Sequence, residues 1–275
     1  MQVKITFLVE NTVPTPGWQG EYGFAALVTV DEKSYLFDTG SADALFANAG
    51  RIGLSLSNID GIIVSHGHFD HTGGIIKSLQ LSDKKVIYAH SNIFADRYVN
   101  MGDAYHPIGS LAGQEDIVKS GGQLVFTDNF TEISPNIYLT GFIPRVTDFE
   151  DAGGNFKVKQ GNNYKDDIIE DDMALVIDHP DGLIVMSGCA HAGIINTLEY
   201  IRGKMDNKRI LAFLGGTHLI SADDNRINQT INYLEELDIK QLVLAHCTGF
   251  YAAAKIYHRL GGKVVKGETG MSFEY

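Results

Sequence analysis

The chain contains few of the residues that stabilise small secreted proteins or anchor membrane proteins. Cysteine is scarce, with 2 residues in 275, so a disulfide framework is excluded as the source of stability and a reducing compartment is expected. No apolar run approaches the ~18 residues that a membrane-spanning helix needs. The opening stretch MQVKITFLVENTVPTPG lacks the basic and apolar regions of a signal peptide. These absences predict a cytoplasmic protein without a membrane partner.

Positive charge is also in short supply. Lysine and arginine number 22 against 34 aspartates and glutamates, which gives a formal net charge of −12. Nucleic acids and anionic membranes bind basic surfaces, so neither is an expected partner. A small anionic substrate stays compatible with this charge, because a bound metal ion reverses the local field. We therefore expect a small-molecule substrate, and the sequence leaves the oligomeric state open.

The apolar content is sufficient for a full core. Hydrophobic residues make up 44% of the chain and charged residues 20%, as in ordinary globular proteins. Short apolar and β-branched runs such as VKITFLV (3–9) and GLIVMSG (182–188) alternate with helical patterns such as RINQTINYLEEL (226–237). This mixture predicts an α/β fold in which helices pack on the outer faces of sheet layers.

One stretch, residues 145–172, differs from its surroundings because it is rich in glycine, asparagine and aspartate and poor in apolar residues. Long irregular segments inside compact domains are uncommon, and most of them are active-site loops or disordered. We predict an active-site lid or loop at residues 145–172, with disorder as the alternative. Its charge run KDDIIEDD (165–172) is expected to be a solvated face.

One predicted strand after another ends in a residue that binds metals or carries charge. Apolar strands whose carboxyl ends converge form a crevice at one edge of a sheet, a usual place for a ligand site. Histidines that are distant in sequence form a metal site when they meet at such an edge. The residues placed in this way are Asp38, His66, Cys189, His191, His218 and His246.

The densest of these strand ends is SHGHFDHTGG (65–74), with three histidines and one aspartate in six positions. His66 and His68 can reach one ion together where the backbone is extended, and Asp70 and His71 then turn toward a neighbouring position. Imidazole suits zinc and iron, and one carboxylate among the nitrogens is common in catalytic sites. Two ions about 3.5–4 Å apart bind a bridging hydroxide and clamp a scissile ester or phosphoester. We expect Asp70 to orient that hydroxide as well as to bind metal.

The remaining candidates each have a second interpretation. Cys189 is either a metal ligand or an inert buried cysteine. His191 and His246 are expected ligands, although each also fits a capping or hydrogen-bonded core role. His218 is a candidate catalytic or substrate-contacting residue, with metal ligand as the alternative. Arg145 is the candidate for binding an anionic substrate, with a helix-capping or surface role as the alternative.

These motifs resemble those of the metallo-β-lactamase fold superfamily. SHGHFDHTGG resembles its H-x-H-x-D-H signature, YLFDTG is similar to its Asp-x-Gly element, and GLIVMSGCAH and LVLAHC look like its later ligand motifs. The resemblance implies a four-layered αββα sandwich, as a single domain over residues 1–275, with metals between the two sheets. It implies that His66 and His68 hold a first metal, that Asp70 and His71 hold a second, and that His246 is the late second-site histidine.

Two departures from the family pattern bear on the number of metals. The usual third-motif histidine has no counterpart, and TGFIPR (140–145) occupies its region. The usual bridging aspartate appears as Cys189, which would leave the second metal weak or absent. Our hypothesis is that His191 supplies the missing first-site ligand. The signature reads H-x-H and not the H-x-E of the superfamily's di-iron electron-transfer members, which favours hydrolytic or group-transfer chemistry.

Three functions compete. The first is a metal-dependent hydrolase that uses a metal-bound hydroxide on an ester or phosphoester, with one or two divalent ions, zinc before iron or manganese. The second is a transferase that joins a dihydropterin methylene to a ribofuranosylaminobenzene phosphate, because TGFIPRVTDFE, GCAHAGIINT, GGTHL and AHCTG look like the subgroup that contains that archaeal synthase and uncharacterised metal-dependent hydrolases. The third is a non-catalytic, metal-bound redox sensor in which Cys189 responds together with Cys247, a residue otherwise expected to be structural.

Overall fold

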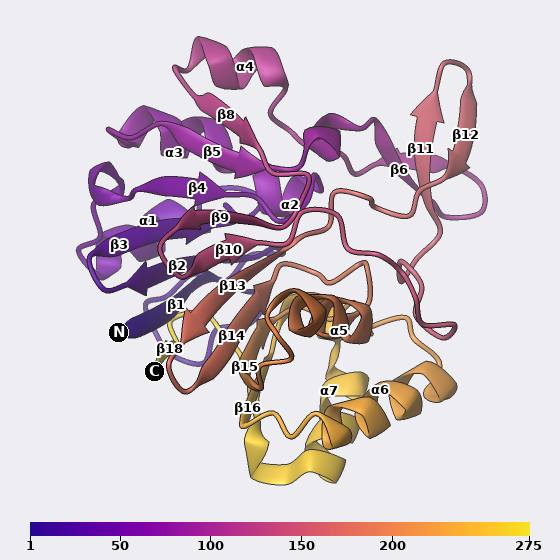
Figure 1. The fold of residues 1–275 in the computed structure, drawn as a ribbon. Coiled ribbons are helices and arrows are strands. Elements are labelled where there is room, and N and C mark those ends of the chain that lie inside the picture. The colour runs from indigo at the N-terminus through magenta and orange to yellow at the C-terminus, as the bar shows by residue number, and fades with distance from the viewer. The chain divides into compact units, whose positions relative to one another are not determined.

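The computed structural model describes residues 1–275, which form two compact units (Figure 1). The first unit comprises Met1–Tyr98, Pro107–Phe126 and Glu268–Tyr275. The second comprises Val99–His106 and Thr127–Gly267. Each unit contains a seven-stranded sheet and helices, which confirms the predicted α/β class. None of the helices combines the length and the apolar character required to cross a bilayer.

The sheet of the first unit has the order β18-β1-β2-β3-β4-β5-β8. Strands β18, β1, β2 and β3 pair antiparallel, whereas β3, β4, β5 and β8 pair parallel. Parallel neighbours need crossover connections, and α1, α2, α3 and α4 lie in these connections. The strands are β1 (Val3–Val9), β2 (Ala25–Val30), β3 (Lys33–Phe37), β4 (Gly61–Ile63), β5 (Val86–Ala89), β8 (Gln123–Phe126) and β18 (Ser272–Glu274). The helices are α1 (Ala44–Arg51), α2 (Phe69–Thr72), α3 (Ile75–Leu81) and α4 (Gln114–Lys119), with 3₁₀ turns at Leu56–Asn58 and Ser91–Phe94.

The first core joins these helices to the sheet. Leu45 of α1 and Ile75 and Leu79 of α3 are fully buried against strand residues such as Leu36 and Ile62. All three residues of β4 are buried, which suits a parallel strand that is covered on both faces. Because this core fixes the end of β4, it also fixes the start of the histidine-rich segment that follows.

The sheet of the second unit has the order β17-β16-β15-β14-β13-β10-β9. Strands β14 to β17 pair parallel and the others antiparallel. Residues of α5, α6 and α7 pack against β13 to β16 in one apolar cluster. The strands are β9 (Thr131–Ser134), β10 (Ile137–Leu139), β13 (Ala174–His179), β14 (Gly182–Ser187), β15 (Ile210–Gly215), β16 (Gln241–Leu244) and β17 (Val264–Lys266). The helices are α5 (Ile194–Lys204), α6 (Asp224–Glu236) and α7 (Phe250–Leu260), with 3₁₀ turns at His246–Thr248 and Gly261–Lys263.

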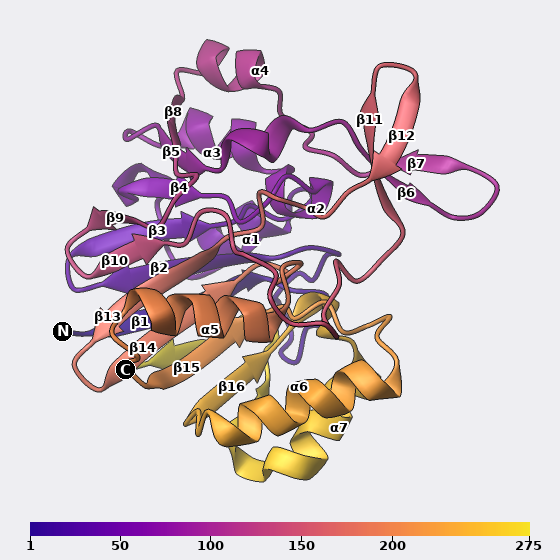
Figure 2. The same ribbon diagram turned by 45° about the vertical axis from the view of Figure 1, so that its right-hand side comes forward.

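A third sheet has the order β12-β11-β6-β7, and most of its residues belong to the second unit. Its strands are β6 (Arg97–Asn100), β7 (Tyr105–Pro107), β11 (Phe156–Gln160) and β12 (Asn163–Asp166). The β11–β12 hairpin stands apart from the seven-stranded sheet of its unit (Figure 2). The stretch 145–172 is therefore not irregular throughout, and its role as a lid stays a prediction.

The charge run at 165–172 is only partly a solvated face. Lys165 and Asp166 are exposed as expected. Asp171 and Asp172 are 0% and 2% exposed, so the expectation is wrong at the end of the run. The reason is that the chain enters the buried strand β13 directly afterwards, and the last two carboxylates enter the interior with it.

Candidate metal centre

The histidine-rich segment leaves the buried end of β4 in an extended conformation and then turns into a short helix. His68 is extended, with φ −84° and ψ 151°, and caps α2 at its N-terminus. Asp70 and His71 therefore lie on the first turn of that helix. The side chains of all four metal-binding candidates are buried, with exposed fractions of 1% for His66, 5% for His68, 5% for Asp70 and 0% for His71. The predicted change from extended to turning backbone is confirmed.

The first two histidines converge. Nε2 of His66 lies 3.0 Å from Nδ1 of His68, and the ring centroids are 4.6 Å apart. Two nitrogens bound to one tetrahedral zinc ion lie about 3.3 Å apart, because each Zn–N bond is about 2.0–2.1 Å long. The two nitrogens thus have the spacing of ligands that share one ion, and the residues present fit a divalent metal.

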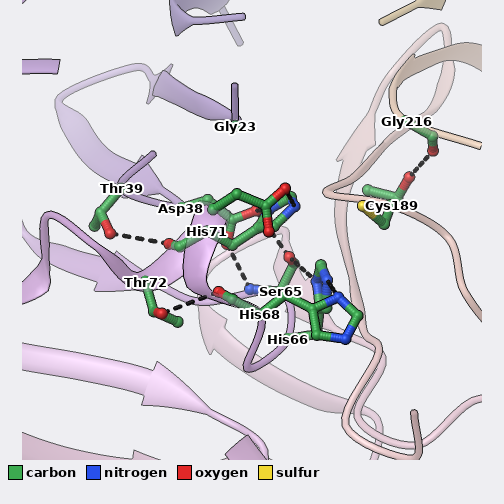
Figure 3. A network of polar contacts seen from close by, with 12 residues as sticks. Gly23, Asp38, Thr39, Ser65, His66, His68, His71, Thr72, Cys189 and Gly216 are labelled. Atoms are coloured by element: carbon green, nitrogen blue, oxygen red, sulfur yellow. Dashed lines mark hydrogen bonds and ion pairs between the residues drawn. The ribbon is translucent and has the colours of Figure 1, made fainter. Parts of the chain in front are cut away.

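Hydrogen bonds around Asp38 determine which ring nitrogens of His66 and His71 carry the proton (Figure 3). The Ser65 hydroxyl donates to Oδ2 of Asp38 at 2.7 Å, so its oxygen accepts the Nδ1 proton of His66 at 2.9 Å. Nδ1 of His71 donates to the same Asp38 Oδ2 at 2.7 Å. Both histidines then carry their lone pair on Nε2, the arrangement that supporting carboxylates impose on metal-binding imidazoles. Nε2 of His71 is 3.7 Å from Oδ2 of Asp70, which places a carboxylate beside it.

The backbone at this site is held by close approaches that only glycine permits. A Cβ atom at Gly67 would lie 2.0 Å from the carbonyl oxygen of Ile93 and 2.8 Å from Nη1 of Arg97. Arg97 is 1% exposed and one of the largest fully buried side chains. Sequence reasoning missed its position beside the H-x-H turn, because nothing local to residue 97 indicates it. The glycine between the two histidines was the available signal for a close approach.

The second unit gathers the other candidates at the carboxyl ends of β14, β15 and β16. A ligand atom of Cys189 lies within 4.8 Å of one on His191 and of one on His246. The group Cys189, His218 and Cys247 lies within 4.8 Å mutually. Parallel pairing of the three strands explains the meeting, because it brings their carboxyl ends to one edge.

His191 is oriented by the stretch 145–172. Its Nδ1 donates to the carbonyl of Ala152 at 2.8 Å, which leaves the lone pair on Nε2. The rings of His191 and His218 are 4.2 Å apart, and a Cβ atom at Gly153 would lie 2.2 Å from Cδ2 of His218. Residues 152 and 153 therefore pack directly against two predicted site histidines.

Asp172 is a buried carboxyl group that sequence reasoning did not select. It accepts the backbone N–H of Ala192 at 2.8 Å, next to His191. Burial raises the pKa of Asp172 to about 6, although the Ala192 hydrogen bond and the charge of Arg145 oppose the shift. Its Oδ1 atom is buried without a hydrogen-bond partner.

Arg145 lies in the same unit and binds the backbone. Its guanidinium donates to the carbonyl oxygens of Ile168, Ile169 (3.0 Å) and Ile143 (3.4 Å). Burial lowers the pKa of Arg145, against the charges of Asp172 and other nearby acids. The side chain thus ties two parts of the 143–169 stretch together, and a role in substrate binding stays a prediction.

Cys247 was expected to be structural, but its surroundings are polar. Its thiol donates to the carbonyl oxygen of Cys189 at 3.7 Å. Burial by itself raises the pKa of the Cys247 thiol, but a hydrogen bond with Cys189 and the charges of His246 and His218 hold it well below the ordinary value. The structure thus gathers His66, His68, Asp70 and His71 in the first unit and Cys189, His191, His218 and His246 in the second. One binuclear centre built from both groups stays a prediction.

Comparison with known proteins identifies the family. The model of the metallo-β-lactamase superfamily matches residues 18–161. A curated relative from Methanocaldococcus jannaschii, 7,8-dihydropterin-6-methyl-4-(β-D-ribofuranosyl)-aminobenzene-5′-phosphate synthase, is 34% identical over 268 residues, 91% of this chain and 89% of the relative. The crystal structure of Tm1679, a metal-dependent hydrolase of the β-lactamase superfamily, shares 30% identity, with a TM-score of 0.84 over 99% of both chains.

A more distant match supports the fold alone. Zinc-bound PqqB from Methylobacterium extorquens is 16% identical with a TM-score of 0.60, and the match covers 99% of both chains. The predicted metallo-β-lactamase-like fold is confirmed. The chain belongs to the metallo-β-lactamase superfamily, in the subgroup that contains the dihydropterin synthase and metal-dependent hydrolases.

Proposed function

We propose that this protein is a metal-dependent hydrolase that cleaves an ester or phosphoester bond in a small molecule. The observation that carries the proposal is the 3.0 Å approach of His66 Nε2 to His68 Nδ1, with both side chains buried. A bound divalent ion, zinc before iron or manganese, supplies an activated water and neutralises negative charge that develops on the substrate. That role also reconciles the net charge of −12 with an anionic substrate.

The residues of the first unit have different roles in the proposed reaction. His66 and His68 hold the ion, and Ser65 keeps the His66 lone pair on Nε2. Asp38 does the same for His71, whose Nε2 stands 3.7 Å from Asp70. The Asp70 carboxylate orients the attacking water and accepts its proton, the task of a general base within hydrogen-bond reach. In the second unit, Cys189, His191 and His246 are the proposed further ligands, and His218 is the proposed catalytic contact to substrate.

A second candidate is a group-transfer reaction. It is favoured by one observation, the 34% identity to a synthase over 91% of this chain. The name of that relative describes a product that joins a dihydropterin to a ribofuranosyl aminobenzene phosphate. In this case the protein binds a dihydropterin and a phosphorylated aromatic ribofuranoside, and the metal site orients one of them.

The test begins with metal content per chain, measured by plasma mass spectrometry on protein purified without chelator or affinity tag. Turnover is then screened on ester and phosphoester panels with the wild type, His68→Ala and His258→Ala. His258 is an exposed histidine on α7 and serves as the matched control. We expect His68→Ala to lose metal and turnover while His258→Ala keeps both.

If His68→Ala in metal-free buffer hydrolyses substrate as fast as the wild type, the hydrolase proposal is wrong. A metal-loaded wild type that hydrolyses no member of the panel, yet binds a dihydropterin in a fluorescence titration, supports the transferase. Absence of dihydropterin binding counts against the transferase.

A further inference from the structure

Three loops of the second unit bring two thiols and an imidazole to one edge of its sheet. Cys189 follows the last residue of β14 by two positions, His218 follows β15 by three, and Cys247 follows β16 by three. The three strands are parallel neighbours. The parallel pairing therefore brings together three residues that are 29 positions apart in the chain (189 to 218, and 218 to 247).

The spacing and burial of the three side chains suit a metal site. Their ligand atoms lie within 4.8 Å of one another. Cys189 and Cys247 are 2% and 4% exposed, and Nδ1 of His218 is buried without a hydrogen-bond partner. Around a tetrahedral zinc ion, with Zn–S bonds of about 2.3 Å and Zn–N bonds of about 2.0–2.1 Å, two sulfurs and one nitrogen lie about 3.6–3.8 Å apart. Each pair of ligand atoms therefore lies no more than about 1.2 Å beyond the spacing that a bound zinc ion requires.

The backbone of the three loops that follow β14, β15 and β16 adopts uncommon conformations beside these side chains. Ala190, His218 and His246 have φ of 52°, 46° and 51°, in the left-handed region that persists in residues other than glycine only where the surroundings hold it. A Cβ atom at Gly216 would lie 2.6 Å from Sγ of Cys247 and 2.4 Å from the carbonyl oxygen of Gly188. Glycine at 216 thus allows the β15 loop to pass against the thiol.

We propose that Cys189, His218 and Cys247 form a thiolate-rich site for a soft metal ion of the zinc class. Two sulfurs and one nitrogen select zinc or copper(I) over magnesium, calcium and manganese, which favour oxygen. Binding replaces the two thiol protons, which are released to solvent. Three protein ligands leave a fourth position for water or substrate, as in catalytic zinc sites. The assignment goes beyond the proposed function, because it adds Cys247 as a ligand and makes His218 a ligand in place of a substrate contact. Cys189, proposed above as a ligand beside His191 and His246, is the residue that the two assignments share.

Cobalt(II) substitution tests the proposal without measuring activity. Reduced, metal-free protein is titrated with cobalt(II), and the thiolate-to-cobalt charge-transfer absorption is recorded in the near ultraviolet. We expect a band in the wild type that falls about twofold in Cys247→Ser and in Cys189→Ser, because each removes one of two thiolates. His218→Ala keeps the band but needs at least about tenfold more cobalt to reach it. His68→Ala and the control His258→Ala keep the wild-type band and affinity.

Separate outcomes overturn the assignment. A cobalt-loaded wild type without the band shows that neither thiol binds the metal. An undiminished band in Cys247→Ser shows that Cys247 is not a ligand, and it overturns the assignment as well. Thiol titration of the purified protein is expected to find both cysteines reduced. If it finds none until a reductant is added, the pair is a disulfide and the proposal fails.

A measurement on the wild type alone keeps the test valid if a variant misfolds. X-ray absorption of the zinc-loaded protein is expected to show sulfur scattering at about 2.3 Å, and nitrogen and oxygen scatterers alone would contradict the site. The two proposals fail separately. Loss of turnover in His68→Ala with an intact cobalt band supports both, whereas a band without any hydrolysis removes only the hydrolase.

Discussion

Asp38 holds the imidazole of His71 from 33 positions earlier in the chain. Oδ2 of Asp38 lies 2.7 Å from Nδ1 of His71, and both side chains are completely buried. Asp38 also accepts the backbone N–H of Ser65 at 2.7 Å and the Ser65 hydroxyl. One carboxylate thus supports two of the histidines that are expected to bind metal.

Asp38→Asn is therefore expected to lower zinc affinity about 10–100-fold, the usual effect of losing such a support. The amide cannot accept from Ser65 and His71 as the carboxylate does, so the His71 lone pair is no longer confined to Nε2. Competition with a chromogenic chelator measures the affinity. Asp43→Asn is the control, since Asp43 is 81% exposed and pairs only with Lys77 at the surface. Equal affinities in the two variants would contradict this role of Asp38.

Gly67→Ala is expected to lower the free energy of unfolding by about 1–3 kcal/mol, the usual cost of overpacking. The added methyl meets the backbone carbonyl of Ile93 at 2.0 Å, and backbone cannot rotate away. The control is Gly50→Ala on α1, where nothing lies within 4 Å of the added Cβ and alanine is the better helix former by about 1 kcal/mol. Urea denaturation of metal-free protein compares the two, and similar stabilities would refute the close approach at Gly67.

Asp172 predicts a pH dependence of stability in metal-free protein. Burial raises its pKa from 3.8 to about 6 in the folded state, so folding favours the protonated form. The stabilising contribution is present below pH 3.8 and is lost as pH rises through about 6. Asp172→Asn does not titrate. Its stability relative to wild type should therefore increase by about 3 kcal/mol across this window.

Denaturant unfolding at several pH values between 3.5 and 7.5 measures the difference in free energy of unfolding between Asp172→Asn and wild type. Asp103→Asn changes an exposed carboxylate and should track the wild type throughout. A constant difference between Asp172→Asn and wild type would show that Asp172 ionises normally in the folded protein.

Zinc should stabilise the folded protein by mass action. At a free zinc concentration about 100-fold above the dissociation constant, the gain is about 2.7 kcal/mol, visible as a rise in the thermal midpoint that a chelator reverses. His66→Ala should show a smaller rise than the wild type, because the nitrogen that faces His68 is removed. The exposed His258 provides the control variant. A thermal midpoint of the wild type that does not change when zinc is added would contradict the metal-binding prediction.

Local chemistry could be predicted from the sequence. The strand at 3–9 matches β1, and the helical pattern at 226–237 matches α6 to within two residues at its start and one at its end. The ligand types in SHGHFDHTGG and the turn between His68 and Asp70 follow from neighbours in the chain. Adjacent residues carry this information because periodicity and glycine positions act within a few residues.

Only the tertiary structure decided which distant groups meet. Asp38 was recognised as the end of a strand, but its bond to His71 depends on the pairing of β3 with β4. The burial of Arg97 beside Gly67 and of Asp172 beside Ala192 has no local signature. Cys247 was expected to be structural, and the parallel register of β14, β15 and β16 placed it against Cys189 and His218. Strand register and packing of the whole core set these contacts, and a short stretch of sequence specifies neither.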